Sequence, residues 1–396
     1  MKHLQNPCLE PDQKLVCLKI TIAFAFFCGF GPSWRLWVSS RQFPLSPISD
    51  SLPIITFPFD LAWFILLFGL LLGIIIASKP RILILTFLVL AGILSSFDQM
   101  RWQPWFYQYF FMMAALGFYA WKKPEVRNNQ TALKTCRFVV IFTYVWSGIQ
   151  KLNVNFVTQT WPDLAGPFLG LLPEGVKKLP SFLILMIPLL ETSIGLGLLT
   201  RKYRNTSVIL AIATHGFVLL VLFTSGENTI VWPWNIAMAL FVLILFWQDS
   251  ETSPRKVLLP TKLFHTLVLV LFGVLPVFSL IGLWDSYLSS ALYSGNTEQA
   301  VIYLSPATVE RLPSNLHQYI WQHTEPFFLD INRWAYGELN VPVYPESRIF
   351  KKVAIQVCSL ANGPPDIKLR ITSSPNPLTG LRESAFYDCE HLYTSR

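Results

Sequence analysis

Nine apolar segments follow one another through the first 284 residues of the chain, and Pro, Gly or charged residues separate them. A helix needs about 20 apolar residues to cross the hydrocarbon core of a bilayer, and most of the segments approach that length. Inside lipid the backbone polar groups must bond to one another, so such segments fold there as helices. The expected spans are 16–37, 54–77, 82–97, 104–121, 136–150, 180–199, 205–224, 230–247 and 262–283.

The proportion of charged residues supports a membrane location. Only 14% of the residues are Asp, Glu, Lys or Arg, whereas a soluble domain has about 25%. This composition excludes a disordered chain, a fibrous repeat and an ordinary cytosolic enzyme. We therefore expect a mostly α-helical, polytopic membrane protein whose main partner is the lipid bilayer.

The distribution of charge predicts an orientation. The net charge is +8, but from Asp285 onward nine Lys and Arg residues face eleven Asp and Glu residues. The excess belongs to the spanning part, and without a basic stripe or binding motif we expect no nucleic-acid partner. With a cytoplasmic N-terminus, the inner loops hold more than twice as many Lys and Arg residues as the outer loops. This bias is typical of a plasma or inner membrane protein.

The chain divides near residue 284. Residues 1–284 form the expected transmembrane domain, and an odd number of spans puts residues 285–396 on the extracytoplasmic side. In this second part we predict a small α+β cap domain. Its expected elements are a helical stretch over 312–339 and strands over 353–357 and 367–371.

Two cysteines support the outer location of the cap domain. Cys358 and Cys389 are the only cysteines in that part of the chain. Disulfides persist outside the cytoplasm, so the pair predicts one disulfide there.

Three outer loops supply the candidate site residues. They offer acidic, basic, amide and aromatic groups at the membrane boundary, on the face that the cap domain would cover. This composition suits a site for an amphipathic substrate with an apolar tail. The residues are Asp98, Arg101, Trp102 and Trp105 in the first loop, Lys151 and Asn153 in the second, and Glu227, Asn228, Trp232 and Asn235 in the third.

Lys151 is the expected catalytic residue. It follows an apolar run and lies near the outer edge of the hydrocarbon. A lysine at this depth can extend its charge to the lipid headgroups. Held in a dry pocket instead, it loses proton affinity and can act as a general base. The sequence leaves both interpretations open.

Glu191 and His215 are ionisable residues within expected spans. Each lies 11 residues from a span boundary, which places both near the midplane of the bilayer. An isolated charge there costs about 3 kcal/mol, so we expect a partner for each. They could form a structural hydrogen-bonded pair, a proton relay or a contact for a quinone. The spacing of His and Cys residues predicts no metal site.

Gly69 and Gly73 form a GxxxG pair in the second span. Small residues at this spacing let two membrane helices approach closely. We therefore expect close packing of this helix within the bundle.

The string Ser-Gly-Ile-Gln-Lys-Leu-Asn-Val-Asn-Phe, from Ser147 to Phe156, resembles the segment around the catalytic lysine of vitamin K-dependent gamma-carboxylase. It is also similar to bacterial HTTM-domain proteins, whose pattern is Ala-Gly-Val-Lys-Lys-Leu-Asp-Ala-Asp-Trp. Lys151 matches the second, catalytic lysine of that pattern, and Gln150 replaces the first. Asp98 with Trp102, Glu191 and His215 match further family positions, and the resemblance covers roughly residues 90–250.

The resemblance implies an activity. In the carboxylase the lysine deprotonates a reduced, vitamin K-like quinone, which then reacts with oxygen, and the resulting base leads to carboxylation of glutamate. Lys151 would be the base here, with Glu191 and His215 supporting the pocket. A secreted or periplasmic protein or peptide would be the substrate.

Several features leave other functions open. Trp105 stands near a position where the family has a histidine, and Asn153 and Asn155 replace two acids. The segment from Glu191 to Arg201 also resembles DoxX-type proteins, which would imply a quinone-binding accessory subunit with a redox partner. A non-catalytic membrane module that binds or anchors a partner is the third alternative.

Overall fold

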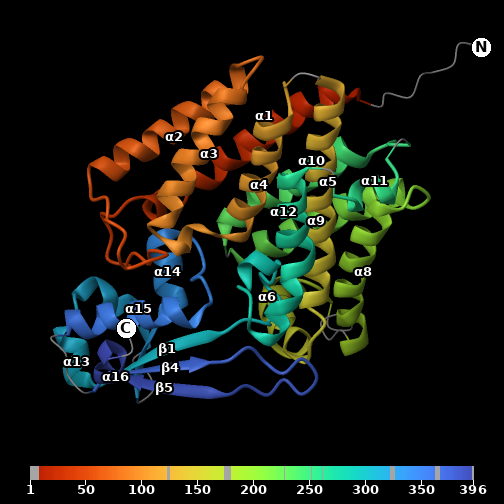
Figure 1. Ribbon diagram of the computed structural model, residues 1–396. Helices are drawn as coiled ribbons and strands as arrows, with labels where there is room; N and C mark the ends of the chain where they lie inside the picture. The colour runs from red at the N-terminus through yellow and green to blue at the C-terminus, as the bar shows by residue number, and fades with distance from the viewer. Residues whose placement is uncertain are drawn as a thin grey trace, which may run out of the picture.

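Apolar helices make up the first part of the chain, and a small domain built around a β-sheet follows them (Figure 1). The computed structural model describes residues 9–122, 125–173, 180–226, 228–250, 252–260, 262–321, 326–361 and 366–394. The longer helices are α1 (Pro11–Phe30), α2 (Phe59–Ile76), α3 (Arg81–Ser96), α4 (Pro104–Tyr119), α5 (Glu125–Gln150), α6 (Trp161–Gly170), α8 (Ser181–Leu199), α9 (Arg204–Ser225) and α10 (Trp232–Phe246).

The last apolar segment is helical but irregular. It begins as α12 (Leu263–Val268), continues as a π-helix over Leu269–Val274 and ends as a 3₁₀-helix over Leu275–Ile281. A short helix, α11 (Pro254–Leu258), precedes it. Pro276 in the second helical position of the 3₁₀ stretch has no backbone N–H to donate, which accounts for the end of the regular ladder.

Seven helices among the described residues are long and apolar enough to cross a membrane. They include α1, α2, α8 and α9, together with most of α5, the stretch Thr229–Phe246 and the stretch Leu263–Ile281. The other two expected spans are also helical, but α3 and α4 have 16 residues each. All nine expected segments therefore form helices, and the chain has the architecture of a helical membrane protein. Two helices of this part of the chain, α6 and α11, were not predicted.

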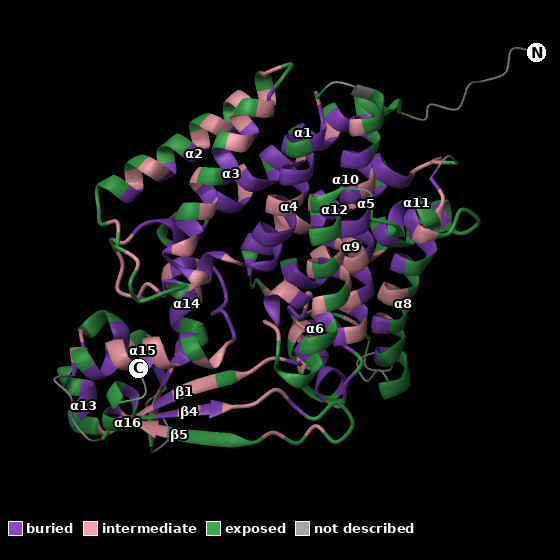
Figure 2. Cartoon of the chain, viewed as in Figure 1, coloured by how far each residue is buried: buried purple, intermediate pink, exposed green. Residues whose placement is uncertain are grey.

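Burial separates the central helix from the peripheral ones. In α5, 78% of the most apolar stretch is buried, whereas 28% is buried in α2 and in α9. Large apolar side chains such as Phe59, Ile76 and Phe223 stand on the outside of the bundle, and Figure 2 shows exposed residues along α2 and α8. Such a surface is stable only against lipid or another apolar partner.

Of the two glycines of the GxxxG pair, Gly73 lies against another helix: an added methyl group would be 3.2 Å from Leu83 Cδ1 in α3. A methyl group added to Gly69 would meet nothing within 4 Å. A methyl group on Gly148 in α5 would lie 2.5 Å from the carbonyl oxygen of Pro188 in α8, and one on Gly195 would lie 2.7 Å from Val145 Cγ2. The expected close packing is therefore found at Gly73 and not at Gly69, and the closest approach to the backbone of another helix joins α5 to α8.

The second domain contains an antiparallel sheet of five strands among its described residues. The strands are β1 (Gln299–Leu304), β2 (Ile320–Trp321), β3 (Phe327–Asp330), β4 (Lys368–Thr372) and β5 (Ser384–Asp388), in the order β2-β3-β1-β4-β5. The helices are α13 (Pro306–Arg311), α14 (Ile331–Leu339), α15 (Ser347–Leu360) and α16 (Cys389–Thr394). The expected α+β composition is confirmed.

Two local predictions in this domain need correction. Residues 353–357 lie in helix α15 and not in a strand, because Ile349, Phe350, Val353 and Val357 repeat with the helical period and are buried along one face. The stretch 312–339 is α-helical only in α14, and a 3₁₀-helix, β2 and β3 precede it. The strand over 367–371 is confirmed as β4.

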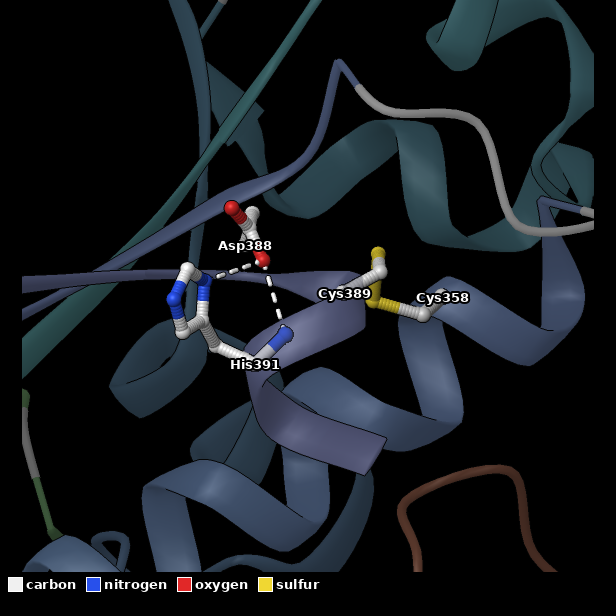
Figure 3. The surroundings of a disulfide bond; sticks show 4 residues. All are labelled: Cys358, Asp388, Cys389 and His391. Atoms are coloured by element: carbon white, nitrogen blue, oxygen red, sulfur yellow. Dashed lines mark hydrogen bonds and ion pairs between the residues drawn. A yellow bond between two sulfur atoms is a disulfide. The ribbon is translucent and has the colours of Figure 1, made fainter. Parts of the chain in front are cut away.

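The predicted disulfide joins Cys358, near the end of α15, to Cys389, at the start of α16 (Figure 3). The same figure shows His391 beside Asp388, with its ring and its backbone N–H each 2.8 Å from one carboxylate oxygen. The disulfide therefore fixes α16 against α15, and the bonds between His391 and Asp388 fix α16 against the sheet.

Replacing both Cys358 and Cys389 with serine should destabilise the cap domain by about 3 to 4 kcal/mol, because the closed loop spans 31 residues and its closure restricts the unfolded chain. Hydrogen exchange of the amides in β1 and β4 measures the change. Cys17→Ser in α1 is the control and should leave this exchange unchanged. Equal protection in the serine pair and the wild type would contradict the prediction.

Loops that follow α1, α3 and α5 contact the cap domain. The Glu338 carboxylate accepts bonds from the backbone N–H groups of Gln42, at 2.5 Å, and Phe43, at 2.9 Å. The Gln103 side chain donates to the carbonyl oxygen of Pro342 at 3.1 Å, and that of Asn153 donates to Ser294 at 2.9 Å. The ends of these helices therefore lie on one side of the bundle, which the cap domain covers.

A partly buried carboxyl group lies where the two parts join. Glu346 Oε1 accepts bonds from the backbone N–H of Ser286, at 2.9 Å, and from its hydroxyl, at 3.1 Å. Burial, and then the nearby Asp285 carboxylate, raise the pKa of Glu346 to about 7. Because the folded state holds this proton more tightly than the unfolded state, its contribution to stability is complete below about pH 4.5 and is lost as the pH rises to about 7.

Glu346→Gln should therefore raise the free energy of unfolding at pH 8 by about 1 to 2 kcal/mol and leave it nearly unchanged at pH 4.5. Chemical denaturation at the two pH values measures the difference. Glu383→Gln, at an exposed position before β5, should shift stability little at either pH. An equal effect of Glu346→Gln at both pH values would refute the assignment.

Candidate functional site

A cavity of about 130 Å³ lies between α5, α6, α8, α9 and α10, on the side of the cap domain. Its polar lining comes mainly from four helices, α5, α8, α9 and α10, and includes Thr143, Tyr144, Ser147, Lys151, Glu191, Thr214, His215 and Asn235. Its apolar lining includes Phe156, Trp161, Leu164, Ile187, Val218, Trp234 and Met238. The cavity can therefore bond to a polar group and also contact a ring or an alkyl chain.

Lys151 and Glu191 form an ion pair in this cavity. Lys151 Nζ lies 2.6 Å from Glu191 Oε2, 2.8 Å from Oε1 and 2.8 Å from Ser147 Oγ. The Ser147 hydroxyl in turn donates to Glu191 Oε2 at 3.0 Å. The side chains of Lys151 and Glu191 are 11% and 12% exposed. Lys151 thus points to a carboxylate within the protein and not to the lipid headgroups.

The packing of α5 on α8 produces this pair. Gly148 and Ser147 lie within one turn of Lys151, and the missing side chain of Gly148 lets α5 approach the backbone of α8 at Pro188. Glu191 stands one turn beyond Pro188 in α8. A larger residue at position 148 would separate the helices and hence the charges.

His215 belongs to a second chain of hydrogen bonds in the same cavity. The Asn235 amide donates to the carbonyl oxygen of Val231 at 2.9 Å, so its own oxygen accepts from His215 Nδ1, also at 2.9 Å. His215 Nε2 then accepts from the Tyr144 hydroxyl at 2.6 Å. This pattern requires an uncharged imidazole with its proton on Nδ1. Glu191 and His215 therefore do not pair with each other, and each has its own partner.

Tyr144 and Ser147 were missed in the sequence. A signal was present, because Tyr144, Ser147 and Lys151 have the spacing of residues on one face of a helix. That face was treated only as part of an apolar span.

The first outer loop lies outside the cavity. Asp98 is fully buried, where its carboxylate pairs with Arg41 and accepts from the backbone N–H groups of Ser46, at 3.2 Å, and Met100, at 3.1 Å. Arg101 donates to the carbonyl oxygen of Leu36 at 2.9 Å. Burial lowers the pKa of Arg101 to about 10 despite the neighbouring Asp98. Both residues connect loops and do not line the cavity with Lys151.

The two tryptophans of that loop also lie elsewhere. Trp105 is buried beside Phe30 and Tyr109, and its ring fills the space next to Gly29. Trp102 lines a separate cavity of about 280 Å³, together with Tyr107, Phe111, Trp284, Asp285 and Tyr344.

The remaining predicted residues shape the neighbouring turns. The Asn153 side chain donates to the carbonyl oxygens of Gln150, at 2.8 Å, and Ser294, at 2.9 Å, and so holds the turn after α5. Asn228 donates to the hydroxyl of Tyr293, which lines the cavity. Trp232 packs near Phe223 at a ring distance of 5.8 Å. Glu227 lies outside the described residues.

Within the described part of the chain, no group of three or more His, Cys, Asp or Glu residues could hold a metal ion. Comparisons of the chain with models of protein families, with curated proteins and with solved structures found no match. The function is therefore argued from the geometry of the cavity and from the residue pattern between Ser147 and Phe156.

Proposed function

We propose that this protein binds a quinol, or another amphiphile with an acidic hydroxyl group, in the cavity and removes the hydroxyl proton. The observation that carries the proposal is the Lys151–Glu191 pair in a cavity that is lined by both polar and apolar side chains. The resemblance to carboxylase-like membrane proteins is consistent with it, since the matched lysine takes part in the pair.

The opposite charges of Lys151 and Glu191 suggest a different role for each residue. The ammonium group of Lys151 uses its three N–H bonds within the pair and with Ser147, so in this state it carries a proton and cannot accept another. The Glu191 carboxylate is the proton acceptor in the same pair. Lys151 would stabilise the oxyanion that remains after the proton has moved to Glu191.

A reduced quinone, when bound, would supply the acidic hydroxyl and the electrons for a reaction with oxygen. The apolar residues Trp161, Ile187 and Val218 would contact its ring. The Tyr144 side chain lines the cavity, and His215 and Asn235 orient its hydroxyl group. This hydroxyl can exchange a proton with a bound polar group. Carboxylation of a secreted or periplasmic protein or peptide is the reaction that the resemblance suggests.

The proposed topology has a cytoplasmic N-terminus, nine spans and an extracytoplasmic cap domain. The contacts between the cap domain and the loops after α1, α3 and α5 support an odd number of crossings. The Cys358–Cys389 disulfide supports an oxidising compartment for the cap domain. The cavity would then open near the outer leaflet.

A second candidate is a quinone-binding subunit that passes electrons to a redox partner. The Tyr144–His215–Asn235 chain favours it, because a quinone takes up protons when it is reduced and such a chain can deliver them. In that case the exchange of electrons would require a partner protein, and Tyr144→Phe would impair it more than changes at Lys151.

Oxygen uptake by the purified protein with a reduced quinone tests the proposal. The variant Lys151→Met with Glu191→Leu removes both charges together, and we expect it to lose at least about 100-fold in rate, as when a general base is lost. Lys19→Met is the control, because Lys19 bonds to the carbonyl oxygens of Ile75 and Ala77, away from the cavity. Uptake that survives in the double variant would exclude the proposed role of the pair.

A further inference from the structure

Two leucines at the tip of the hairpin between β4 and β5 stand out on the cap domain. Leu378 is 86% exposed and Leu381 is 74% exposed. Neighbouring leucines at such exposure are unfavourable in water and are typical of a surface that meets a partner. The tip comprises residues 375–381.

The tip has a defined conformation. The backbone N–H of Asn376 donates to the carbonyl oxygen of Leu381 at 2.8 Å, and the N–H of Gly380 donates to that of Asn376 at 2.9 Å. The Asn376 side-chain oxygen accepts from the N–H groups of Leu378, at 3.0 Å, and Thr379, at 3.1 Å. Gly380 has a φ of 70°, which favours glycine. The leucines are therefore presented by a closed turn.

Arg382 fixes the base of this turn to the rest of the domain. Its guanidinium group donates to the carbonyl oxygens of Ser373 at 2.7 Å, Thr297 at 2.8 Å and Gly295 at 2.9 Å. The hairpin cannot swing freely with all three bonds in place. The position of the leucines is thus tied to the position of the sheet.

The tip touches the end of the helical bundle. The backbone N–H of Val154, four residues after the end of α5, donates to the carbonyl oxygen of Pro377 at 3.0 Å. Figure 1 shows the hairpin loop below α6 and near the ends of the helices. A methyl group added to Gly380 would lie 3.4 Å from Val154 Cγ1. Val154 is 37% exposed and Leu152 is 39% exposed. The tip therefore continues the exposed apolar surface at the end of α5.

We propose that the β4–β5 hairpin tip inserts Leu378 and Leu381 into the interfacial layer of the leaflet on the side of the cap domain. The occupant of this surface is lipid, because the tip bonds to the segment after α5, at the end of the apolar helices, and adjoins the exposed side chain of Val154 there. The contact holds the cap domain at a fixed height over the segment that leads from α5 to α6. It depends neither on the proposed reaction nor on which side of the membrane the cap domain lies.

Fluorescence in proteoliposomes tests the proposal. The four cysteines outside the disulfide are replaced by serine, Leu378 or Glu310 is changed to cysteine, and an environment-sensitive dye is attached. Glu310, in α13, is exposed and lies in the cap domain away from the hairpin. The vesicles contain phosphatidylcholine with or without a spin label near the headgroup end of the acyl chain.

We expect the spin-labelled lipid to quench the dye at 378 several times more strongly than the dye at 310, and aqueous iodide to show the opposite order. A dye attached at position 381 in place of Leu381 should be quenched in the same order as the dye at 378. Agreement between the two positions excludes a local effect of one substitution. Strong iodide quenching at both hairpin positions would overturn the proposal. Protection from iodide without quenching by lipid would also overturn it and would indicate a protein partner or a second copy of the chain.

Discussion

Lys151→Met should lower the free energy of unfolding by about 3 to 5 kcal/mol, because it leaves the Glu191 carboxylate buried without its partner. The double variant with Glu191→Leu removes both charges and should recover most of this loss. Unfolding in detergent micelles, followed by circular dichroism with increasing denaturant, measures both changes. The comparison separates the structural role of the pair from its role in the proposed reaction.

Two outcomes would contradict this expectation. Lys122→Met, at an exposed position between α4 and α5, should change stability by less than about 0.5 kcal/mol. An effect of Lys151→Met as small as this control would mean that the pair does not form in the folded protein. A double variant as unstable as the single variant would assign the loss to altered packing and not to the unpaired charge.

Gly148→Ala should destabilise the protein by at least about 2 kcal/mol, because the added methyl group would overlap the carbonyl oxygen of Pro188 across the α5–α8 contact. The separation of the helices should also lengthen the Lys151–Glu191 contact. We therefore expect the rate of oxygen uptake to fall along with stability. The same unfolding measurement in micelles records the first effect.

The same substitution at Gly69 is a matched control. An added methyl group meets nothing within 4 Å there, and alanine is a better helix former than glycine by about 1 kcal/mol. Gly69→Ala should therefore leave stability unchanged or raise it slightly. Destabilisation of equal size at both glycines would show that the α5–α8 contact is not the tight one.

Within the cap domain, the local sequence pattern predicted some elements, whereas others depend on pairing between segments. The alternation in β4 predicted a strand, and the two cysteines predicted a disulfide. In α15 the β-branched residues favoured a strand, but the helical repeat of the buried side chains decided the structure. Strands β1, β2, β3 and β5 were not predicted. Strand β1 pairs with β3 and β4, which are distant in the sequence, whereas β5 pairs with β4, the preceding strand of the same hairpin.

The residues of the candidate site were also predicted only in part from the sequence. Lys151, Glu191, His215 and Asn235 were predicted and line one cavity, whereas Asp98 and Arg101 connect loops outside it. Counting residues along each span placed Glu191 and Lys151 at different depths, so the ion pair between them was not predicted. Tyr144 was missed because its helical spacing with Ser147 and Lys151 lies within an otherwise apolar span.

Taken by itself, the sequence determined that this chain folds as apolar helices with a disulfide-linked α+β domain. Hydrophobic segment length and residue type decide those features locally, as the helices from α1 to α10 show. Which side chains contact one another depends on the packing of the helices in the tertiary structure. The contact of Gly148 with α8 pairs Lys151 with Glu191, and the Asn235 side chain, near the start of α10, orients His215 toward Tyr144. These are distances between helices, and no periodicity within one helix encodes them.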